Sequence, residues 1–310
     1  MIGKFSRCLV LVLPFFACAF LFLPAPSFGQ PRLKLMASIF PLYEFAREIG
    51  GDQIQAEMLL PPGMEPHTWE PKPSEVARIS QMDLFLFIGR GMEPWAAQVL
   101  RAAQGRRLRV VEVGRELASS GITLPAPSER GSKEVFDPHL WLDFALDQKV
   151  AEIIALALGE GNPENAARYQ ARARALRGRL EELDRKYQTA LAACRHRQII
   201  HGGHPAFAYL ARRYGLSQVA LYGLNPNAEP TPRRLAEVLQ VVKRQGVRYI
   251  FFEELVSPKL ARVLAREAGI GTLVLNPGAN LTVEQRRRQV TFWQLMEANL
   301  ENLRRGLECG

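Results

Sequence analysis

The most regular hydrophobic pattern in the chain runs from residue 162 to residue 193. Apolar or aromatic residues recur there at helical spacing: Tyr169, Ala173, Leu176, Leu180, Leu183, Tyr187 and Leu191. Asn162 can cap this helix, and Pro163 suits its first position. About 30 residues at about 1.5 Å each give a rod of about 45 Å, which is longer than most globular helices. The pattern therefore predicts one stiff helix that joins two parts of the chain.

Short apolar runs alternate with helical patterns on both sides of this helix. Before it, the sequence predicts strands at 33–38, 54–59, 84–88 and 108–113, and helices at 42–49, near 74, at 94–103 and at 146–158. After it, strands at 198–201, 218–221, 249–252 and 272–275 alternate with helices at 205–214, 231–244, 258–268 and one long helix from Thr282. This alternation is typical of parallel sheets built from β-α-β units. We therefore predict an α/β fold of two lobes with parallel sheets, joined by one long rigid helix.

The beginning of the chain has the layout of a secretory signal. Two basic residues precede an apolar run at 8–23, and small residues follow it. The run is shorter than the roughly 20 residues that a membrane span needs, and Pro14 interrupts it. We expect export to the periplasm or another extracytoplasmic space, with cleavage near residue 29; a lipid anchor at Cys18 is the alternative. The predicted domains are a signal peptide at 1–29, an N-terminal lobe at 30–161, the connecting helix at 162–193 and a C-terminal lobe at 194–310.

The charge of the chain is basic, but its distribution does not indicate nucleic-acid binding. The sequence has 40 Lys and Arg against 31 Asp and Glu, a formal net charge of +9. Removal of the signal takes away Lys4 and Arg7 and leaves +7. The arginines are spread over predicted helix faces, with no aromatic interleaving and no nucleic-acid motif beside them. We interpret them as a solvated basic surface and expect no nucleic-acid partner.

Two cysteines, Cys194 and Cys309, remain after removal of the signal. In an oxidising compartment they could pair and tie the C-terminus to the second lobe, or both could stay free. The sequence leaves these alternatives open. There is no C-x-x-C motif and no cysteine at zinc-finger spacing from a histidine, so a cysteine-based zinc site is not expected.

Three of the five histidines fall in loops beside predicted core elements. His67 follows a strand in a Pro/Gly-rich loop, His139 precedes a helix, and His204 follows the end of a strand. Each histidine alone is more often a structural or surface residue than a ligand. Neutral imidazole is nevertheless the commonest side-chain metal ligand, and zinc sites take three or four N, O or S donors. A proline beside each histidine would limit loop motion and favour a preorganised site.

The sequences around these histidines resemble the motifs of a known family. Pro-Pro-Gly-Met-Glu-Pro-His67-Thr-Trp-Glu-Pro, Asp-Pro-His139-Leu-Trp-Leu-Asp and His204-Pro-Ala-Phe-Ala-Tyr-Leu look like its three metal-ligand motifs in order, and Ala-Glu229-Pro-Thr-Pro is similar to the signature that follows. The family is that of the zinc and manganese receptors of ABC importers, of the zinc-uptake and adhesin-lipoprotein type. The resemblance extends from Lys34 to the C-terminal helix.

The resemblance implies a binding protein and not an enzyme. It implies two α/β lobes joined by one long helix, with His67, His139 and His204 as metal ligands. Three imidazoles resemble the zinc-type members, whereas manganese-type members usually carry a carboxylate at the third position. We therefore expect Zn²⁺ as the transported ligand, with Mn²⁺ as the alternative in a manganese or iron receptor of the same family. The implied partner is the membrane permease of an ABC transporter, and we expect the chain to act as a monomer.

The fourth ligand departs from the family pattern. The family normally has Asp in a late Leu-Asp-Pro segment, where this chain has Leu275-Asn276-Pro277. An amide oxygen can coordinate a metal but carries no charge, so three neutral imidazoles and Asn276 would leave the charge of the ion uncompensated. We therefore expect weaker binding, a water or hydroxide in the fourth position, or compensation by Glu65. Residues 119–133 contain no histidine, unlike the His-rich loop of many zinc-type members.

Other polar residues are weaker candidates for the site. His201 lies close to His204 in sequence, but the flanking motif favours His204 as the ligand. His196 is predicted to be a surface residue at a strand edge. Three glutamates could line the cleft between the lobes, although capping or surface roles are the default: Glu229, Glu253 and Glu254.

An exported zinc hydrolase is the alternative from a different class. A three-histidine site with an open fourth position could lower the pKa of a bound water to about 7, with Glu65 as a nearby base. The sequence has no H-E-x-x-H motif, no second metal cluster and no motif for a particular substrate. These observations favour the binding protein over the hydrolase.

Overall fold

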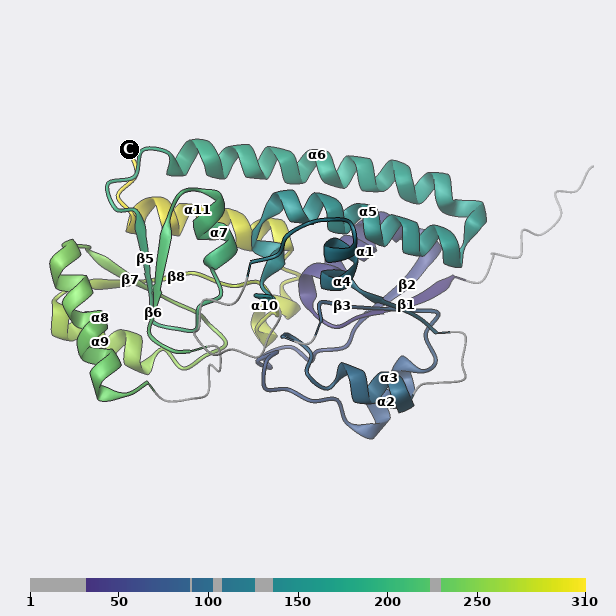
Figure 1. Ribbon diagram of the computed structural model, residues 1–310, viewed down its shortest axis with the longest axis horizontal. Helices are drawn as coiled ribbons and strands as arrows, with labels where there is room; N and C mark the ends of the chain where they lie inside the picture. Colours follow the sequence, from purple (N-terminus) through teal and green to yellow (C-terminus); the bar gives the residue numbers. More distant parts are fainter. Residues whose placement is uncertain (1–31, 90, 103–107, 126–135, 224–229) are drawn as a thin grey trace, which may run out of the picture. The chain divides into compact units, whose positions relative to one another are not determined.

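Two sheets, each of four parallel strands, organise the part of the chain that the structure describes (Figure 1). The computed structural model describes residues 32–89, 91–102, 108–125, 136–223 and 230–310. The predicted signal peptide at 1–29 with Cys18, most of the segment 119–133, and Glu229 lie outside the described residues. The strand orders are β2-β1-β3-β4 and β6-β5-β7-β8, so that both sheets have the same topology.

The centre of the first sheet is buried on both faces, whereas its edge strands are partly exposed. Its strands are β1 (Leu33–Ala37), β2 (Ile54–Met58), β3 (Leu84–Phe87) and β4 (Arg109–Glu112). All four residues of β3, Leu-Phe-Leu-Phe, are buried, which is the near-continuous apolar run expected of a central parallel strand. The helices of this half are α1 (Phe40–Gly50), α2 (Pro73–Ile79), α3 (Ala96–Ala102), α4 (Val113–Ser119) and α5 (Phe144–Gly161).

The second sheet repeats this arrangement after the long helix. Its strands are β5 (Gln198–His201), β6 (Ser217–Ala220), β7 (Tyr249–Phe252) and β8 (Gly271–Val274). The helices are α7 (Ala208–Arg213), α8 (Pro232–Gln245), α9 (Lys259–Ala268), α10 (Val283–Arg287) and α11 (Phe292–Gly306). Local signals fix α8, because Thr231 caps its first turn and Gly246 ends it in the left-handed conformation. The predicted fold class of two α/β lobes with parallel sheets is confirmed.

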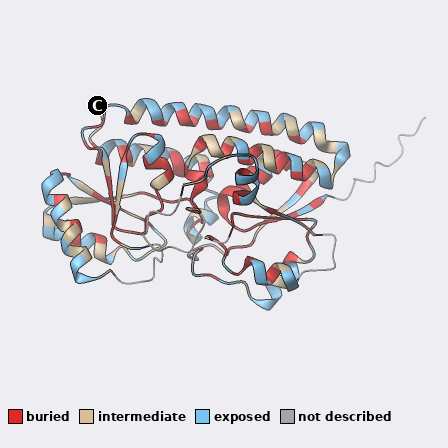
Figure 2. Cartoon of the chain, in the orientation of Figure 1, coloured by how far each residue is buried: buried red, intermediate tan, exposed pale blue. Residues whose placement is uncertain are grey.

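The long helix is α6 (Ala166–Leu191), and a 3-10 turn at Pro163–Asn165 leads into it. The seven residues of its predicted apolar face are all buried, and buried and exposed positions alternate along it in Figure 2. On the first half, Arg172 donates to the carbonyl of Gly50 at 2.8 Å. On the second half, Asp184 forms an ion pair with Arg213 of α7. The helix is therefore attached to both halves by polar contacts as well as by its apolar face.

The main hydrophobic core is continuous across both sheets. It includes Leu35 of β1, Leu180 of α6, Phe251 of β7 and Phe292 of α11. Aromatic contacts connect the two halves within this core, because the ring centroid of Phe292 lies 5.1 Å from that of Phe45 in α1. A smaller, separate cluster lies under α8 and α9. A shared core resists wide separation of the lobes, because separation would expose apolar surface. The predicted domain boundaries stay predictions.

The C-terminal region differs from the sequence prediction. The single long helix expected from Thr282 consists of two helices, α10 and α11. Gln289 between them has a φ of 55°, and Thr291 then opens α11 with a capping box to Gln294. A residue in the left-handed conformation cannot continue a right-handed helix, so the chain turns there. In addition, α4 has no counterpart among the predicted helices.

Cys194 and Cys309 form a disulfide that spans 115 residues of sequence. Of the two alternatives left open by the sequence, the structure therefore has the paired one. The bond ties the last residues of the chain to the segment that leads into β5. Disulfides persist in oxidising compartments, which agrees with the predicted export. No helix among the described residues is both long and apolar enough to cross a membrane.

Candidate metal centre

Three histidine side chains from three separate segments meet at one point. His67 follows β2, His139 directly precedes a 3-10 turn at Leu140–Leu142, and His204 follows β5. The Nε2 atom of His139 lies 3.1 Å from Nε2 of His67 and 3.0 Å from Nε2 of His204. Nitrogen ligands about 2.0–2.1 Å from a tetrahedral zinc ion lie about 3.3 Å from one another. The three nitrogens can therefore share one metal ion after small shifts.

Close backbone packing brings His204 to this point. Gly202 and Gly203 connect β5 to His204. A Cβ atom on Gly203 would lie 2.1 Å from Oε1 of Glu253, and one on Gly202 would lie 2.5 Å from the Cβ of Ala261. Only glycine lets the chain pass so close to Glu253 and α9. The glycine pair thus allows His204 to sit beside the carboxylate at the end of β7.

A buried carboxylate orients each of the two fully buried histidines. Nδ1 of His139 donates to Oδ1 of Asp137 at 2.8 Å, and the same oxygen accepts the backbone N–H of His139 at 3.0 Å. Nδ1 of His204 donates to Oε1 of Glu253 at 2.8 Å, and that oxygen accepts the backbone N–H of His204 at 3.1 Å. With the proton on Nδ1, the lone pair of Nε2 is left for a metal.

These two carboxylates also change the charge balance of the site. The sequence analysis considered only the charges of the ligands themselves and of Glu65. Asp137 and Glu253 place two carboxylates one hydrogen bond behind the imidazoles, where they can balance the charge of a divalent ion. Burial would raise the pKa of Glu253, but the charge of His204 and the hydrogen bonds from it outweigh burial and lower this pKa to about 2. Glu253 is therefore ionised at neutral pH.

His67 is held differently from the other two. Its side chain is partly exposed, and its hydrogen-bond partner besides the cluster is the backbone of Gly91 and not a carboxylate. Its backbone N–H donates to Oε1 of Glu65 at 3.3 Å. Loss of hydration in the cluster and the two neighbouring imidazoles lower the pKa of His67 well below its usual value. His67 is therefore neutral near pH 7, with a nitrogen that can bind a metal.

Glu65 and Asn276 line the small cavity that the histidines enclose. Burial raises the pKa of Glu65 to about 7. The side chain of Asn276 already has two partners: its Oδ1 accepts the N–H of Gly278 at 2.7 Å, and its Nδ2 donates to Oε2 of Glu254 at 2.9 Å. Asn276 thus lies at the cavity wall, and both polar atoms of its amide already have hydrogen-bond partners. Its role as the fourth ligand stays a prediction.

The other histidines lie outside the cluster. His201 is fully buried behind it, where its Nδ1 hydrogen-bonds to the carbonyl of His204 at 3.2 Å and its ring packs on Phe207. His196 is buried and not at the surface as predicted. The reason is the C-terminal segment, because the backbone N–H of His196 donates to the carbonyl of Leu307 and Glu308 lies beside its ring.

Two fully buried aromatic residues, Trp141 and Tyr209, also support the site through their polar atoms. Nε1 of Trp141 donates to the carbonyl of Pro277 at 2.7 Å, and the hydroxyl of Tyr209 donates to the carbonyl of Asp137 at 2.9 Å. Both bonds connect residues next to the cavity from different halves of the chain. Sequence reasoning missed this role and that of Asp137. The local signal for Asp137 is its place two residues before His139, within reach of the same backbone turn.

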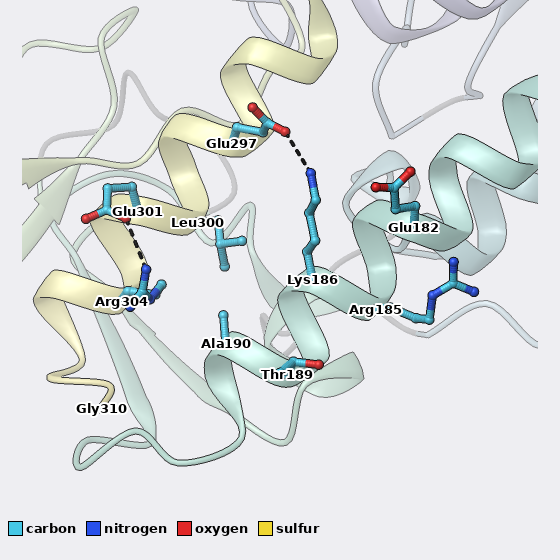
Figure 3. A pocket seen from close by; sticks show the side chains of 10 residues that line it. All are labelled: Glu182, Arg185, Lys186, Thr189, Ala190, Glu297, Leu300, Glu301, Arg304 and Gly310. Carbon is cyan, nitrogen blue, oxygen red and sulfur yellow. Dashed lines mark hydrogen bonds and ion pairs between the residues drawn. The ribbon is translucent and has the colours of Figure 1, made fainter.

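A second, larger hollow lies between α6 and α11 (Figure 3). Its walls carry charges of both signs, and four of them form ion pairs across or along the helices: Lys186 with Glu297, and Arg304 with Glu301. None of its ten lining residues is a histidine or a cysteine. This hollow therefore does not compete with the histidine cluster as a metal site.

The fold and the site define a class: a two-lobe α/β protein with a three-histidine cluster able to hold a metal ion between segments from both halves. The profile of the ZnuA family, described as the zinc-uptake complex component A, periplasmic, matches residues 35–306. The chain belongs to this family.

Relatives and solved structures agree with this membership. The chain is 33% identical over 287 residues to the high-affinity zinc uptake system protein ZnuA of Bacillus subtilis, covering 89% of this chain and 88% of that protein. It is 33% identical over 290 residues to the zinc-binding protein AdcA of Streptococcus pyogenes, covering 89% of this chain. It spans only 56% of the length of that relative, about half of the protein.

The crystal structure of the Zn(II)-bound ZnuA-like domain of Streptococcus pneumoniae AdcA superposes with a TM-score of 0.76 at 33% identity, covering 89% of this chain and 99% of that domain. The laminin-binding protein Lmb of Streptococcus agalactiae gives a TM-score of 0.78 at 30% identity, covering 89% of this chain and 99% of that one. Both likenesses extend over the two lobes.

Proposed function

We propose that this protein captures Zn²⁺ outside the cytoplasmic membrane and delivers it to the permease of an ABC importer. The observation that carries the proposal is the convergence of three Nε2 atoms, two of which have their Nδ1 protons fixed by carboxylates. The zinc-binding names and the zinc-bound structure of relatives support the same metal. The family name supports a periplasmic place in an uptake complex.

The composition of the cluster supports zinc over manganese. The three ligand atoms are imidazole nitrogens, and no carboxylate oxygen belongs to the same group among the described residues. Imidazole suits zinc, whereas carboxylate, carbonyl and water suit manganese. We propose His67, His139 and His204 as the ligands.

Two residues that line the cavity are candidates for the fourth coordination position. Asn276 is the predicted ligand, and Glu65 is the ionisable alternative. The variants Asn276→Asp and Glu65→Gln separate them in a zinc titration. If Asn276 is the ligand, the added charge of Asn276→Asp tightens zinc binding and Glu65→Gln has little effect. If Glu65 is the ligand, Glu65→Gln weakens binding, and Asn276→Asp does not tighten it because its carboxylate then faces Glu254.

Binding and release require only limited motion in this proposal. The metal ligands come from both halves, while α6 and the continuous core connect those halves. We propose that the ion enters and leaves by movement of the loop that carries His67, the partly exposed ligand, without wide separation of the lobes.

The test is a direct metal measurement. Protein purified without chelator is analysed for bound metals, and the metal-free protein is then titrated with zinc and manganese in competition with a chromophoric chelator. We expect one zinc ion per chain and a clear preference for zinc over manganese. Manganese binding as tight as zinc binding, or no bound metal at a stoichiometry near one, would contradict the proposal.

A further inference from the structure

The segment that follows β8 is hydrogen-bonded to the loop that leads to His67. Asn280 in this segment is fully buried. Its Nδ2 donates to the carbonyl of Pro61 at 2.8 Å and to the carbonyl of Met64 at 2.9 Å. Its Oδ1 accepts the backbone N–H of Leu281 at 2.8 Å. Both amide hydrogens and the amide oxygen of Asn280 are therefore in use.

Two backbone hydrogen bonds accompany the Asn280 side chain. The N–H of Gly63 donates to the carbonyl of Leu281 at 2.7 Å, and the N–H of Phe40 donates to the carbonyl of Ala279 at 2.9 Å. Asn280 and the residues it holds are more than 200 positions apart in sequence. The resulting bridge, formed by residues 279–281 on one side and by Phe40 and residues 61–64 on the other, connects the second half of the chain to the first beside the cluster.

The bridge ends at Met64, three residues before His67. Of the three proposed ligands, His67 is the one whose ring has no carboxylate partner among the described residues. His139 and His204 are oriented by buried carboxylates. His67 is partly exposed, and among the described residues its ring is hydrogen-bonded to the backbone of Gly91 and not to a carboxylate. The position of His67 therefore depends on the loop that carries it. That loop has its own turn at residues 65–69, and its hydrogen bonds to the segment around Asn280 attach it to the second half of the chain.

We propose that Asn280 is a positioning residue for metal binding: by holding the loop of Pro61–Met64, it keeps His67 within reach of the ion and sets the rate of metal release. This inference rests on the proposed function. In this proposal, Asn280 does not contact the metal ion. Breaking the bridge frees the one ligand that can move, so the ion leaves faster.

The amide of Asn280 suits this task because it offers two hydrogens to two carbonyl oxygens. In Asn280→Asp the side chain keeps its size and its bond from Leu281, but an ionised carboxylate cannot donate to Pro61 or Met64 and would face their oxygens. Asn302 provides the matched control. Its Nδ2 donates to the carbonyl of Val274 at 2.9 Å, so that Asn302→Asp also breaks an amide-to-carbonyl bond, but one that does not connect to the loop of His67.

The experiment measures zinc release from the full-length, zinc-loaded protein into an excess of chromophoric chelator by stopped flow. We expect the dissociation rate of Asn280→Asp to rise about tenfold, as the loss of one to two net hydrogen bonds implies, and that of Asn302→Asp to stay within about twofold of wild type. Amide hydrogen exchange is the second readout. The Gly63 N–H should exchange faster in Asn280→Asp and at the wild-type rate in Asn302→Asp.

The readouts separate a positioning role from a loss of stability. Unchanged release with faster Gly63 exchange, or equal acceleration of release in both variants, would overturn the role of Asn280. If wild-type protein bound no zinc, the proposed function would fail, while Gly63 exchange in metal-free protein would still report on the bridge. If Asn280→Asp does not fold, Asn280→Ser, which keeps one donor, is measured against Asn302→Ser with the same expected direction.

Discussion

His139 and His204 differ from His67 in the group that is hydrogen-bonded to the imidazole ring. The first two are buried, and a single carboxylate oxygen accepts from both the ring and the backbone of each. His67 is partly exposed and lies in a proline-rich loop. The bridge at Asn280, which joins distant parts of the same chain, holds that loop. Two of the proposed ligands are thus oriented by their immediate neighbours, and the third is positioned by contacts between distant parts of the chain. This difference suits the proposed function, because a protein that delivers an ion must bind it firmly and still release it.

Removal of a ligand should test this asymmetry with the largest effect. Structural zinc sites bind with about 10–16 kcal/mol, so each of roughly four ligands contributes on the order of 100- to 1,000-fold in affinity. We expect His204→Ala to weaken zinc binding by at least that factor. His67→Ala should cost less, because a water molecule can take the place of a partly exposed imidazole. Competition titrations measure both, with His196→Gln as the control outside the cluster; equal losses for His67 and His204 would contradict the asymmetry.

The carboxylates behind the rings should have the next largest effect. Glu253→Gln and Asp137→Asn keep the shape of each side chain but remove its charge, and an amide can present its NH₂ group to the imidazole and disturb the proton on Nδ1. Loss of such supporting partners typically costs 10–100-fold in metal affinity. We expect a loss in this range for both variants in a competition titration. Glu57→Gln, which removes a carboxylate paired with Arg78 at the edge strand β2, should leave zinc affinity unchanged.

The same residues show how far sequence alone reaches. Local motifs identified His67, His139 and His204, and the apolar period identified α6, because each of these signals lies within a short stretch of chain. Glu253 lies 49 residues from His204, and no local pattern connects the two. The Asn280 bridge spans more than 200 residues and depends on the packed fold. The break between α10 and α11 was missed because Gln289, and not Gly or Pro, adopts the left-handed conformation.

Acidification should act mainly through one histidine. Burial lowers the pKa of His204, but the charge of Glu253 and the hydrogen bond to it outweigh burial and raise this pKa above its usual value. Burial lowers the pKa of His139 despite Asp137, and the pKa of His67 is lowered still further. In the metal-free protein, a proton therefore binds first at His204 as the pH falls. That proton occupies the nitrogen that zinc needs, so zinc affinity is highest above the pKa of His204 and is lost below it.

For a single competing proton, the apparent dissociation constant should rise about tenfold per pH unit below that pKa. Titrations between about pH 5 and pH 8 measure this slope. In Glu253→Gln the raised pKa is no longer maintained, so the loss of affinity on acidification should begin at lower pH than in wild type. A zinc affinity that does not change over this range would contradict three imidazoles as ligands.

The disulfide should have the smallest effect on zinc and a large effect on stability. Cys194 lies before β5 and His204 after it, so the bond to Cys309 fixes the end of the strand that is remote from the cluster. A disulfide that closes a loop of this length restricts the unfolded chain, and its removal typically costs about 2–5 kcal/mol. We expect Cys194→Ser with Cys309→Ser to lower the free energy of unfolding by about that amount in urea titrations, with zinc affinity within about twofold of wild type. A loss of affinity as large as that of Glu253→Gln would show that β5 transmits changes from the disulfide to His204, and that the support of His204 is not confined to its neighbouring carboxylate.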